Sequence, residues 1–160
     1  CCMLFYIWIR FEWQFSLAAI LALIHDVIIT VGIFSLLSYE INLSIIAAVL
    51  TIVGYSMNDT VVIFDRIREN LKKYPKIPMI EISNNSTNQT LSRTLITSVT
   101  TLLALFSIFI FGGAILKGFS FAMIIGVIIG TYSSIFVATP ILNYTNVNSK
   151  SILKEEKENN

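Results

Sequence analysis

The chain has 160 residues, of which 55% are hydrophobic and 13% are charged, and its mean hydropathy is +0.76. Soluble domains carry roughly 25% charged residues, so this composition excludes an ordinary soluble domain and favours a helical bundle embedded in a lipid bilayer. The formal net charge is +1, and the Lys and Arg residues flank apolar runs instead of forming one basic surface, which argues against a nucleic-acid partner.

The N-terminal run, residues 1–9, is far shorter than the roughly 20 apolar residues that cross a bilayer. It is therefore expected to be the end of a truncated transmembrane helix. Cys1 and Cys2 are adjacent and lack metal-ligand spacing, which favours free thiols. Residues 10–13, Arg-Phe-Glu-Trp, form a polar corner with aromatic side chains suited to the membrane interface. The N-terminal run at residues 1–9 has neither a basic start nor a small-residue cleavage site, so no cleavable signal peptide is predicted.

Longer apolar runs predict four complete transmembrane helices, at residues 14–38, 41–57, 94–111 and 119–143. Residues 10–144 are thus predicted to form one all-α membrane domain. Residues 145–160 are rich in Asn, Lys and Glu and are predicted to be a disordered tail.

The connections between these spans are predicted from their composition. Residues 39–42 form a tight connection between the first two spans. Residues 71–93 contain three lysines, two prolines and an Asn-, Ser- and Thr-rich segment, which predicts a surface loop with room for only a short helix. Residues 112–118 are glycine-rich and are predicted to be the turn before the last span.

The basic residues predict the orientation of the bundle. Lys117 is alone on one side, while the other side collects Arg10, Arg66, Arg68, Lys72, Lys73, Lys76, Arg93, Lys150, Lys154 and Lys157. By the positive-inside rule the basic side is cytoplasmic. Four spans then return the tail, and with it the C-terminus, to the cytoplasm.

The second predicted span continues into a charged segment without a proline. Apolar residues at steps of three and four leave a narrow stripe here, which predicts an amphipathic cytoplasmic segment near residues 61–73 that lies along the membrane surface. Arg66 follows Asp59 by seven residues and precedes Glu69 by three, so these three side chains share a helix face.

Asp26 is the strongest candidate for chemistry because it lies near the middle of the first complete span. An ionised carboxylate there costs about 2.5 kcal/mol or more, so burial favours uptake of a proton. A carboxyl group that gains and loses a proton can carry protons across the membrane. The alternative is a protonated Asp26 that is hydrogen-bonded to a neighbouring hydroxyl and serves packing only. His25 is adjacent, but neighbouring side chains on a helix point about 100° apart, and a packing role is favoured for it.

Asp59 follows Asn58 near the cytoplasmic end of the second span. It could complete a relay with Asp26 or hold Arg66, and a plain carboxylate at the end of a span is the alternative. Arg66 is also suited to anchor the helix at the membrane surface.

The last two spans carry rows of hydroxyl or small side chains. Thr94, Thr97 and Thr101 lie on one face of the third span, where they can hydrogen-bond to another helix or line a wet path. Small residues recur at every fourth position of the last span and would let another helix approach closely. They are Ala122, Gly126, Gly130, Ser134 and Ala138.

The sequence contains no phosphate-binding glycine-rich loop, no nucleophile–base arrangement and no cluster with metal-ligand spacing. It therefore predicts neither an enzyme nor a bound cofactor or metal. A proton gradient is the energy source that the buried carboxylate suggests.

Three stretches resemble the SecF family. Residues 54–70, Gly-Tyr-Ser-Met-Asn-Asp-Thr-Val-Val-Ile-Phe-Asp-Arg-Ile-Arg-Glu-Asn, are similar to the family's signature. Residues 25–30, His-Asp-Val-Ile-Ile-Thr, and residues 88–98, Asn-Gln-Thr-Leu-Ser-Arg-Thr-Leu-Ile-Thr-Ser, resemble it as well. The resemblance covers about residues 10–144.

The resemblance implies a helical bundle of the resistance–nodulation–division transporter type in the bacterial inner membrane. It also implies SecD and the SecYEG channel as partners, unfolded preproteins as substrates, and the proton-motive force as the energy source. Asp26 would carry the proton, and Asp59 and Arg66 would couple its charge to helix movement. The supporting residues would be His25, Asn58, Asp65, Thr97 and Thr101. The family's first span and outer domain would precede Cys1 and are not in this sequence.

Two other functions fit the same residues. One is a proton-coupled exporter of small molecules or lipids from the same superfamily, which would need a hydrophobic substrate cavity. The other is a non-transporting assembly fragment that only packs against a partner through its small-residue ridge.

Overall fold

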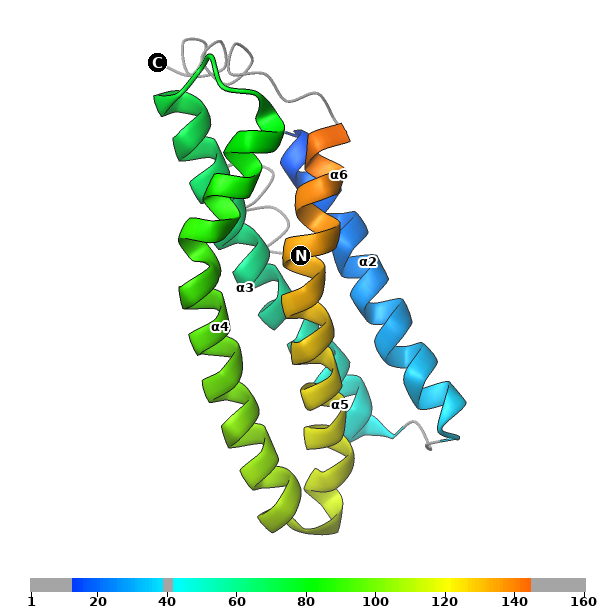
Figure 1. The fold of residues 1–160 in the computed structure, drawn as a ribbon. Coiled ribbons are helices and arrows are strands. Elements are labelled where there is room, and N and C mark those ends of the chain that lie inside the picture. Colours follow the sequence, from blue (N-terminus) through cyan, green and yellow to red (C-terminus); the bar gives the residue numbers. More distant parts are fainter. Residues whose placement is uncertain (1–12, 39–41, 145–160) are drawn as a thin grey trace, which may run out of the picture.

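The computed structural model describes residues 13–38 and 42–144, and every regular element within them is a helix (Figure 1). The predictions for residues 1–9, for the start of the polar corner and for the tail at 145–160 lie outside the described residues. The elements are α2 (Trp13–Leu36), α3 (Leu43–Lys73), α4 (Met79–Phe111), α5 (Gly113–Ser133), the π-helical turn η1 (Ser134–Ala138) and α6 (Thr139–Tyr144). The predicted all-α bundle is confirmed.

Four helices of the described chain are long and apolar enough to cross a membrane: α2, α3, α4, and the continuous run from α5 through η1 to α6. Their order is that of the four predicted spans. Asn42 caps the start of α3, where its side-chain oxygen accepts a hydrogen bond from the backbone N–H of Ile45 at 3.1 Å. Lys72 and Lys73 occupy the last turn of α3, where positive charge is favourable.

The loop predicted at residues 71–93 is wrong, because α4 already begins at Met79. Serine and threonine are weak helix formers in isolation, but here they bond to their own helix: Ser86 Oγ donates to the carbonyl of Ile82 at 2.7 Å, and Thr90 Oγ1 to that of Ser86 at 3.0 Å. Packing of this buried polar face against α3 and α6 then outweighs the low helix propensity of these residues.

The turn predicted at residues 112–118 is also too long. The backbone N–H of Gly112 still bonds to the carbonyl of Ile108 at 2.7 Å, and α5 starts one residue later. Gly113 has a φ of +73°, a left-handed conformation that glycine adopts without a Cβ clash. Two glycines are therefore enough to reverse the chain.

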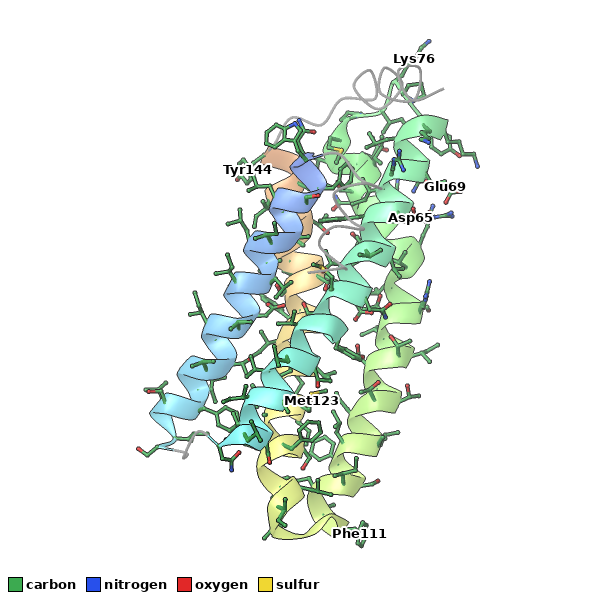
Figure 2. All side chains as sticks on the ribbon, turned by 180° about the vertical axis from the view of Figure 1, so that it is seen from behind. Asp65, Glu69, Lys76, Phe111, Met123 and Tyr144 are labelled. Carbon is green, nitrogen blue, oxygen red and sulfur yellow. The ribbon has the colours of Figure 1, made fainter. Side chains whose placement is uncertain are left out.

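α3 and α5 form the centre of the bundle, since they pack against each other and each also contacts α2 and α4 (Figure 1). The connection between α3 and α4 lies at the same end of the bundle as α6, and the turn between α4 and α5 lies at the opposite end. Figure 2 shows Asp65, Glu69 and Lys76 at the first end and Phe111 at the other.

Two apolar clusters are separated by a layer of buried polar side chains. The first cluster contains Phe15 and Phe64, whose rings meet edge to face with centroids 5.4 Å apart. The second contains Phe34 and Val127. Between them along α2, α3 and α5–η1 lies the group that we term the buried polar layer: Asp26, Ser56, Thr60, Ser133 and Ser134.

The predicted small-residue ridge of the last span is buried along its whole length, and it lets α3 and α5 approach closely. A Cβ added to Gly126 would lie 2.3 Å from the side chain of Ile52, and one added to Gly130 would lie 3.1 Å from the Cβ of Ser56. The close approach places Ser56 of α3 against the backbone of α5.

Gly126→Ala is expected to destabilise the bundle by about 1–3 kcal/mol, because the new methyl group must displace Ile52. Thermal unfolding in lipid nanodiscs measures the effect. Gly54→Ala is the matched control: a Cβ there meets nothing within 4 Å, so the change should stabilise α3 by about 0.5–1 kcal/mol. Equal behaviour of the two variants would contradict the close packing.

Candidate functional site

Asp26 is 1% exposed and lies in the middle of α2. Ser56 on α3, which is 3% exposed, donates a hydrogen bond from Oγ to Asp26 Oδ2 at 2.5 Å. The carboxylate therefore joins two membrane-spanning helices through a short hydrogen bond. Apolar clusters lie on both sides of this contact, and a hydrogen bond in apolar surroundings is electrostatically stronger than the same bond in solvent.

His25 contacts the other carboxylate oxygen, with Nδ1 3.0 Å from Asp26 Oδ1. Its side chain is 34% exposed, whereas Asp26 is buried. Contact between the two neighbours was not predicted, since adjacent helix residues point in different directions, but the imidazole reaches back along the helix surface. His25 thus connects the buried carboxylate to the outside of the described bundle.

The remaining hydroxyls of the buried polar layer continue from Ser56 towards η1. Thr60 Oγ1 lies 3.1 Å from the carbonyl of Ser56 and 3.1 Å from Ser134 Oγ. Ser134 Oγ in turn lies 2.8 Å from the carbonyl of Gly130. A line of polar contacts therefore runs from Asp26 on α2, through α3, to the first residue of the π-helical turn.

Asp59 is 4% exposed and precedes Thr60 on α3. Its Oδ2 has no hydrogen-bond partner within the described chain, and Arg93 on α4 attracts it electrostatically. The structure does not bring Asp59 into hydrogen-bond contact with Asp26 or with Arg66, the two partners considered from the sequence. A buried carboxylate oxygen without a donor is costly to keep ionised.

Arg66 makes its contacts on the side of α4. Its Nε donates to Gln89 Oε1 at 2.6 Å, and its Nη1 donates to Glu69 Oε2 at 2.5 Å, one turn along α3. Buried Asn70 completes this cluster, with Nδ2 donating to Ser86 Oγ at 2.8 Å and to Gln89 Oε1 at 3.2 Å. We term Arg66, Asn70, Ser86 and Gln89 the α3–α4 clamp.

The other predicted residues lie outside both groups. Asn58 and Asp65 are exposed on α3. Thr97 and Thr101 are half-buried, and each donates to a carbonyl of α4 itself. The hydroxyl of α4 that reaches another helix is instead Ser98, whose Oγ lies 2.7 Å from Thr131 Oγ1 on α5.

Several residues of the site were not predicted: Ser56, Thr60, Ser134, Asn70, Ser86 and Gln89. The sequence held a signal for one of them, because Ser134 belongs to the small-residue ridge that another helix was expected to approach. The partner positions on α3 depend on the helix rotation, which sequence periodicity alone does not define. No group of three or more His, Cys, Asp or Glu side chains that could hold a metal ion occurs among the described residues.

Four apolar spans around a buried carboxylate define the class: this is a multi-pass helical membrane protein with an ionisable group in its core. Residues 1–148 match the family described as "Protein export membrane protein SecD/SecF, C-terminal". The chain belongs to this family.

Curated relatives agree with the family match. The protein translocase subunit SecF of Rhodothermus marinus is 62% identical over 143 residues, which cover 86% of this chain and 46% of the relative. That of Cereibacter sphaeroides is 52% identical over 152 residues, covering 95% of this chain and 47% of the relative. The chain thus spans about half the length of the curated relatives that it matches.

Solved structures give the same fold. A crystal structure of SecDF in a super-membrane-facing form is 46% identical with a TM-score of 0.85, and the match covers 98% of this chain and 21% of that one. A crystal structure of SecDF from Thermus thermophilus, described as a translocon-associated membrane protein, is 48% identical, also with a TM-score of 0.85, over 90% of this chain and 20% of that one. The SecD/SecF-like bundle expected from the sequence is confirmed.

Asn70→Ala is expected to destabilise the α3–α4 clamp by about 1–3 kcal/mol, because the buried contact with Ser86 and the partly buried contact with Gln89 lose their donor. Thermal unfolding of the chain in nanodiscs measures the change. Asn85→Ala, at an exposed position of α4, should alter stability by no more than about 0.5 kcal/mol. A clamp variant as stable as this control would show that the side-chain contacts do not hold α3 to α4.

Proposed function

We propose that this chain is the membrane part of a SecF-type component of bacterial protein export, and that it uses the proton-motive force. The observation that carries the proposal is the 62% identity to a protein translocase subunit SecF across 143 residues. That identity extends over 86% of this chain. The role is transport and not catalysis, as the relatives' names indicate.

Asp26 is the proposed proton carrier. It is buried between two helices, where an ionised carboxylate needs hydrogen-bond donors or a positive charge nearby and a neutral carboxyl group does not. Ser56 stabilises the ionised form, while His25 provides a contact that reaches the surface. The proposed proton path therefore leads from Asp26 through its contact with His25.

Asp59 and Arg66 are the proposed coupling residues. Asp59 is a second buried carboxylate on the helix that carries Ser56, and Arg93 of α4 attracts it. Arg66 belongs to the α3–α4 clamp, which joins the same two helices closer to the end of the bundle. A change in charge at Asp26 or Asp59 would thus alter the force between α3 and α4, and the clamp would keep their ends together. Asn58, Asp65, Thr97 and Thr101 remain candidates for supporting roles.

The proposed partners are SecD, the SecYEG channel and unfolded preproteins, and the proposed location is the inner membrane with a cytoplasmic C-terminus. The solved structures that resemble this chain are of SecDF, which supports pairing with SecD. The basic residues of α3 and the following connection lie at one end of the bundle, opposite the turn between α4 and α5 (Figure 2). This asymmetry supports a cytoplasmic position for that end.

A small-molecule exporter fits less well. An apolar groove between α2 and α3, lined by Val31, Phe34, Ile45, Ile46, Val49 and Leu50, has a volume of about 180 Å³. Ligand sites usually measure about 300–1,000 Å³ and contain a few polar groups. This groove is smaller and entirely apolar, so the groove itself does not support small-molecule transport.

The proposal is tested in a chimera that replaces the matching half of the Cereibacter sphaeroides SecF with this chain, in cells depleted of their own SecF. Asp26→Asn is expected to remove the gradient-dependent part of preprotein export, since an amide cannot carry the proton. Pulse-chase measurement of signal-peptide removal gives the export rate. Glu81→Gln, the same change of acid to amide at an exposed position of α4, should leave the rate unchanged.

Full gradient-dependent export by the Asp26→Asn chimera would remove the proton-carrier role. An unmutated chimera that inserts correctly but does not support export would contradict the SecF-type function itself. Co-purification of the chimera with SecD from detergent-solubilised membranes tests the pairing separately, and loss of SecD from a correctly inserted chimera would overturn it.

A further inference from the structure

We propose that Ser56 and the Thr60–Ser134 hydroxyl pair are positioning residues that transmit the charge state of Asp26 to the π-helical turn η1. The inference rests on the proposed role of Asp26 as proton carrier and adds the element that responds to it. The contacts that carry it cross from α2 to α3 and from α3 to η1.

Ser56 changes its hydrogen bonding when Asp26 changes its charge. An ionised carboxylate only accepts hydrogen bonds, and Ser56 Oγ donates to it at 2.5 Å. A protonated carboxyl group can itself donate, which frees the Ser56 hydroxyl to donate elsewhere. A serine within a helix then has the carbonyl one turn earlier as an alternative acceptor. Protonation therefore shifts the hydroxyl of Ser56 between α2 and its own helix.

Thr60 and Ser134 cannot satisfy all of their contacts at once. Their two hydroxyl protons face three contacts: the carbonyl of Ser56 at 3.1 Å, the carbonyl of Gly130 at 2.8 Å and the contact between the two hydroxyls at 3.1 Å. When Thr60 donates to Ser56, Ser134 can donate to Thr60; when Thr60 donates to Ser134, Ser134 donates to Gly130. In a third arrangement each hydroxyl donates to the carbonyl of its own helix, and the contact between the two hydroxyls carries no proton. The pair thus has three arrangements, which favour the α3 carbonyl, the α5 carbonyl or both.

On the α5 side, this hydroxyl pair lies next to a closely packed glycine and the π-helical turn. Gly130 lies so close to Ser56 that an added Cβ would be 3.1 Å from the Ser56 Cβ. The π-helical turn begins at Ser134, whose carbonyl accepts a hydrogen bond from Thr139 Oγ1 at 3.2 Å. π-Helical turns are rare and occur often at functional sites. A hydroxyl pair with more than one hydrogen-bond arrangement therefore contacts the least regular turn of the last span.

Few charges compete with Asp26 for control of this pair. The titratable groups of the described chain at this level are His25 on α2 and Tyr55 and Asp59 on α3, with Arg93 of α4 acting on Asp59. Tyr132 on α5 is exposed. From α5 and η1 the described groups at this level are hydroxyls and backbone carbonyls. Among these groups, Asp26 is the one to which Ser56 donates a hydrogen bond.

Hydrogen exchange of the backbone amides of residues 130–138 tests the coupling, with the chain in lipid nanodiscs. Asp26→Asn, which is permanently neutral, is expected to change exchange in this segment by about five-fold or more, the lower range of measured couplings between sites. In a Ser56→Ala or a Thr60→Val background the same Asp26→Asn change should have an effect below about two-fold. Thr60→Ser keeps the hydroxyl and should retain the full coupling.

Ser120→Ala is the matched control, because Ser120 is a buried serine of α5 that bonds only within its own helix. The coupling should persist in that background. Persistence of the full coupling in both Ser56→Ala and Thr60→Val, or an Asp26→Asn variant with unchanged exchange at residues 130–138, overturns the inference. Loss of export in the Asp26→Asn chimera together with unchanged exchange would reject the coupling alone, whereas retained export would reject the proton-carrier role.

Discussion

The hydrogen bond between Asp26 and Ser56 is the interaction around which the bundle is built. A carboxylate at this depth has no water to solvate it, so the protein must bring a donor to it. Ser56 donates from α3 to α2, and the same residue packs tightly against α5, where a Cβ added to Gly130 would lie 3.1 Å from the Ser56 Cβ. The apolar clusters above and below then keep the bond dry. The small-residue ridge of α5 therefore packs against the same turn of α3 that supplies the hydrogen-bond donor to Asp26.

The surfaces of the outer helices, α2 and α4, are apolar. Large apolar side chains such as Ile24 and Ile28 on α2 and Leu103 and Ile110 on α4 are exposed on the bundle surface. In water such surfaces would drive aggregation, but in a bilayer they contact lipid tails that are equally apolar. Many serines and threonines are buried instead, and several of them donate to a carbonyl of their own helix. Asp59 Oδ2 is one of the buried side-chain atoms of the described residues that lack a hydrogen-bond partner, and such an oxygen on an ionisable group is typical of a functional position.

The sequence was sufficient to predict the four spans, the central place of Asp26 and the ridge of the last helix, because each depends on a pattern within one segment. The start of α4 was mispredicted: its Asn, Ser and Thr residues disfavour a helix locally, and only packing against α3 and α6 compensates. Ser56 and Thr60 were overlooked for a related reason, since a hydroxyl within an apolar helix has no distinguishing pattern until its partner helix is in place. The contact of Arg66 with Gln89 likewise depends on how two helices are rotated.

The length of α3 has a mechanical consequence. Its 31 residues extend about 46 Å, whereas the apolar core of a bilayer is about 30 Å thick, so the helix passes well beyond the lipid as one rigid rod. Ser56 lies near the middle of this rod, and Asn70 lies about 21 Å further along it. A tilt of roughly 10° about the level of Ser56 would move the far end by about 4 Å. Because the clamp ties that end to α4, a tilt of α3 would move the neighbouring part of α4 with it.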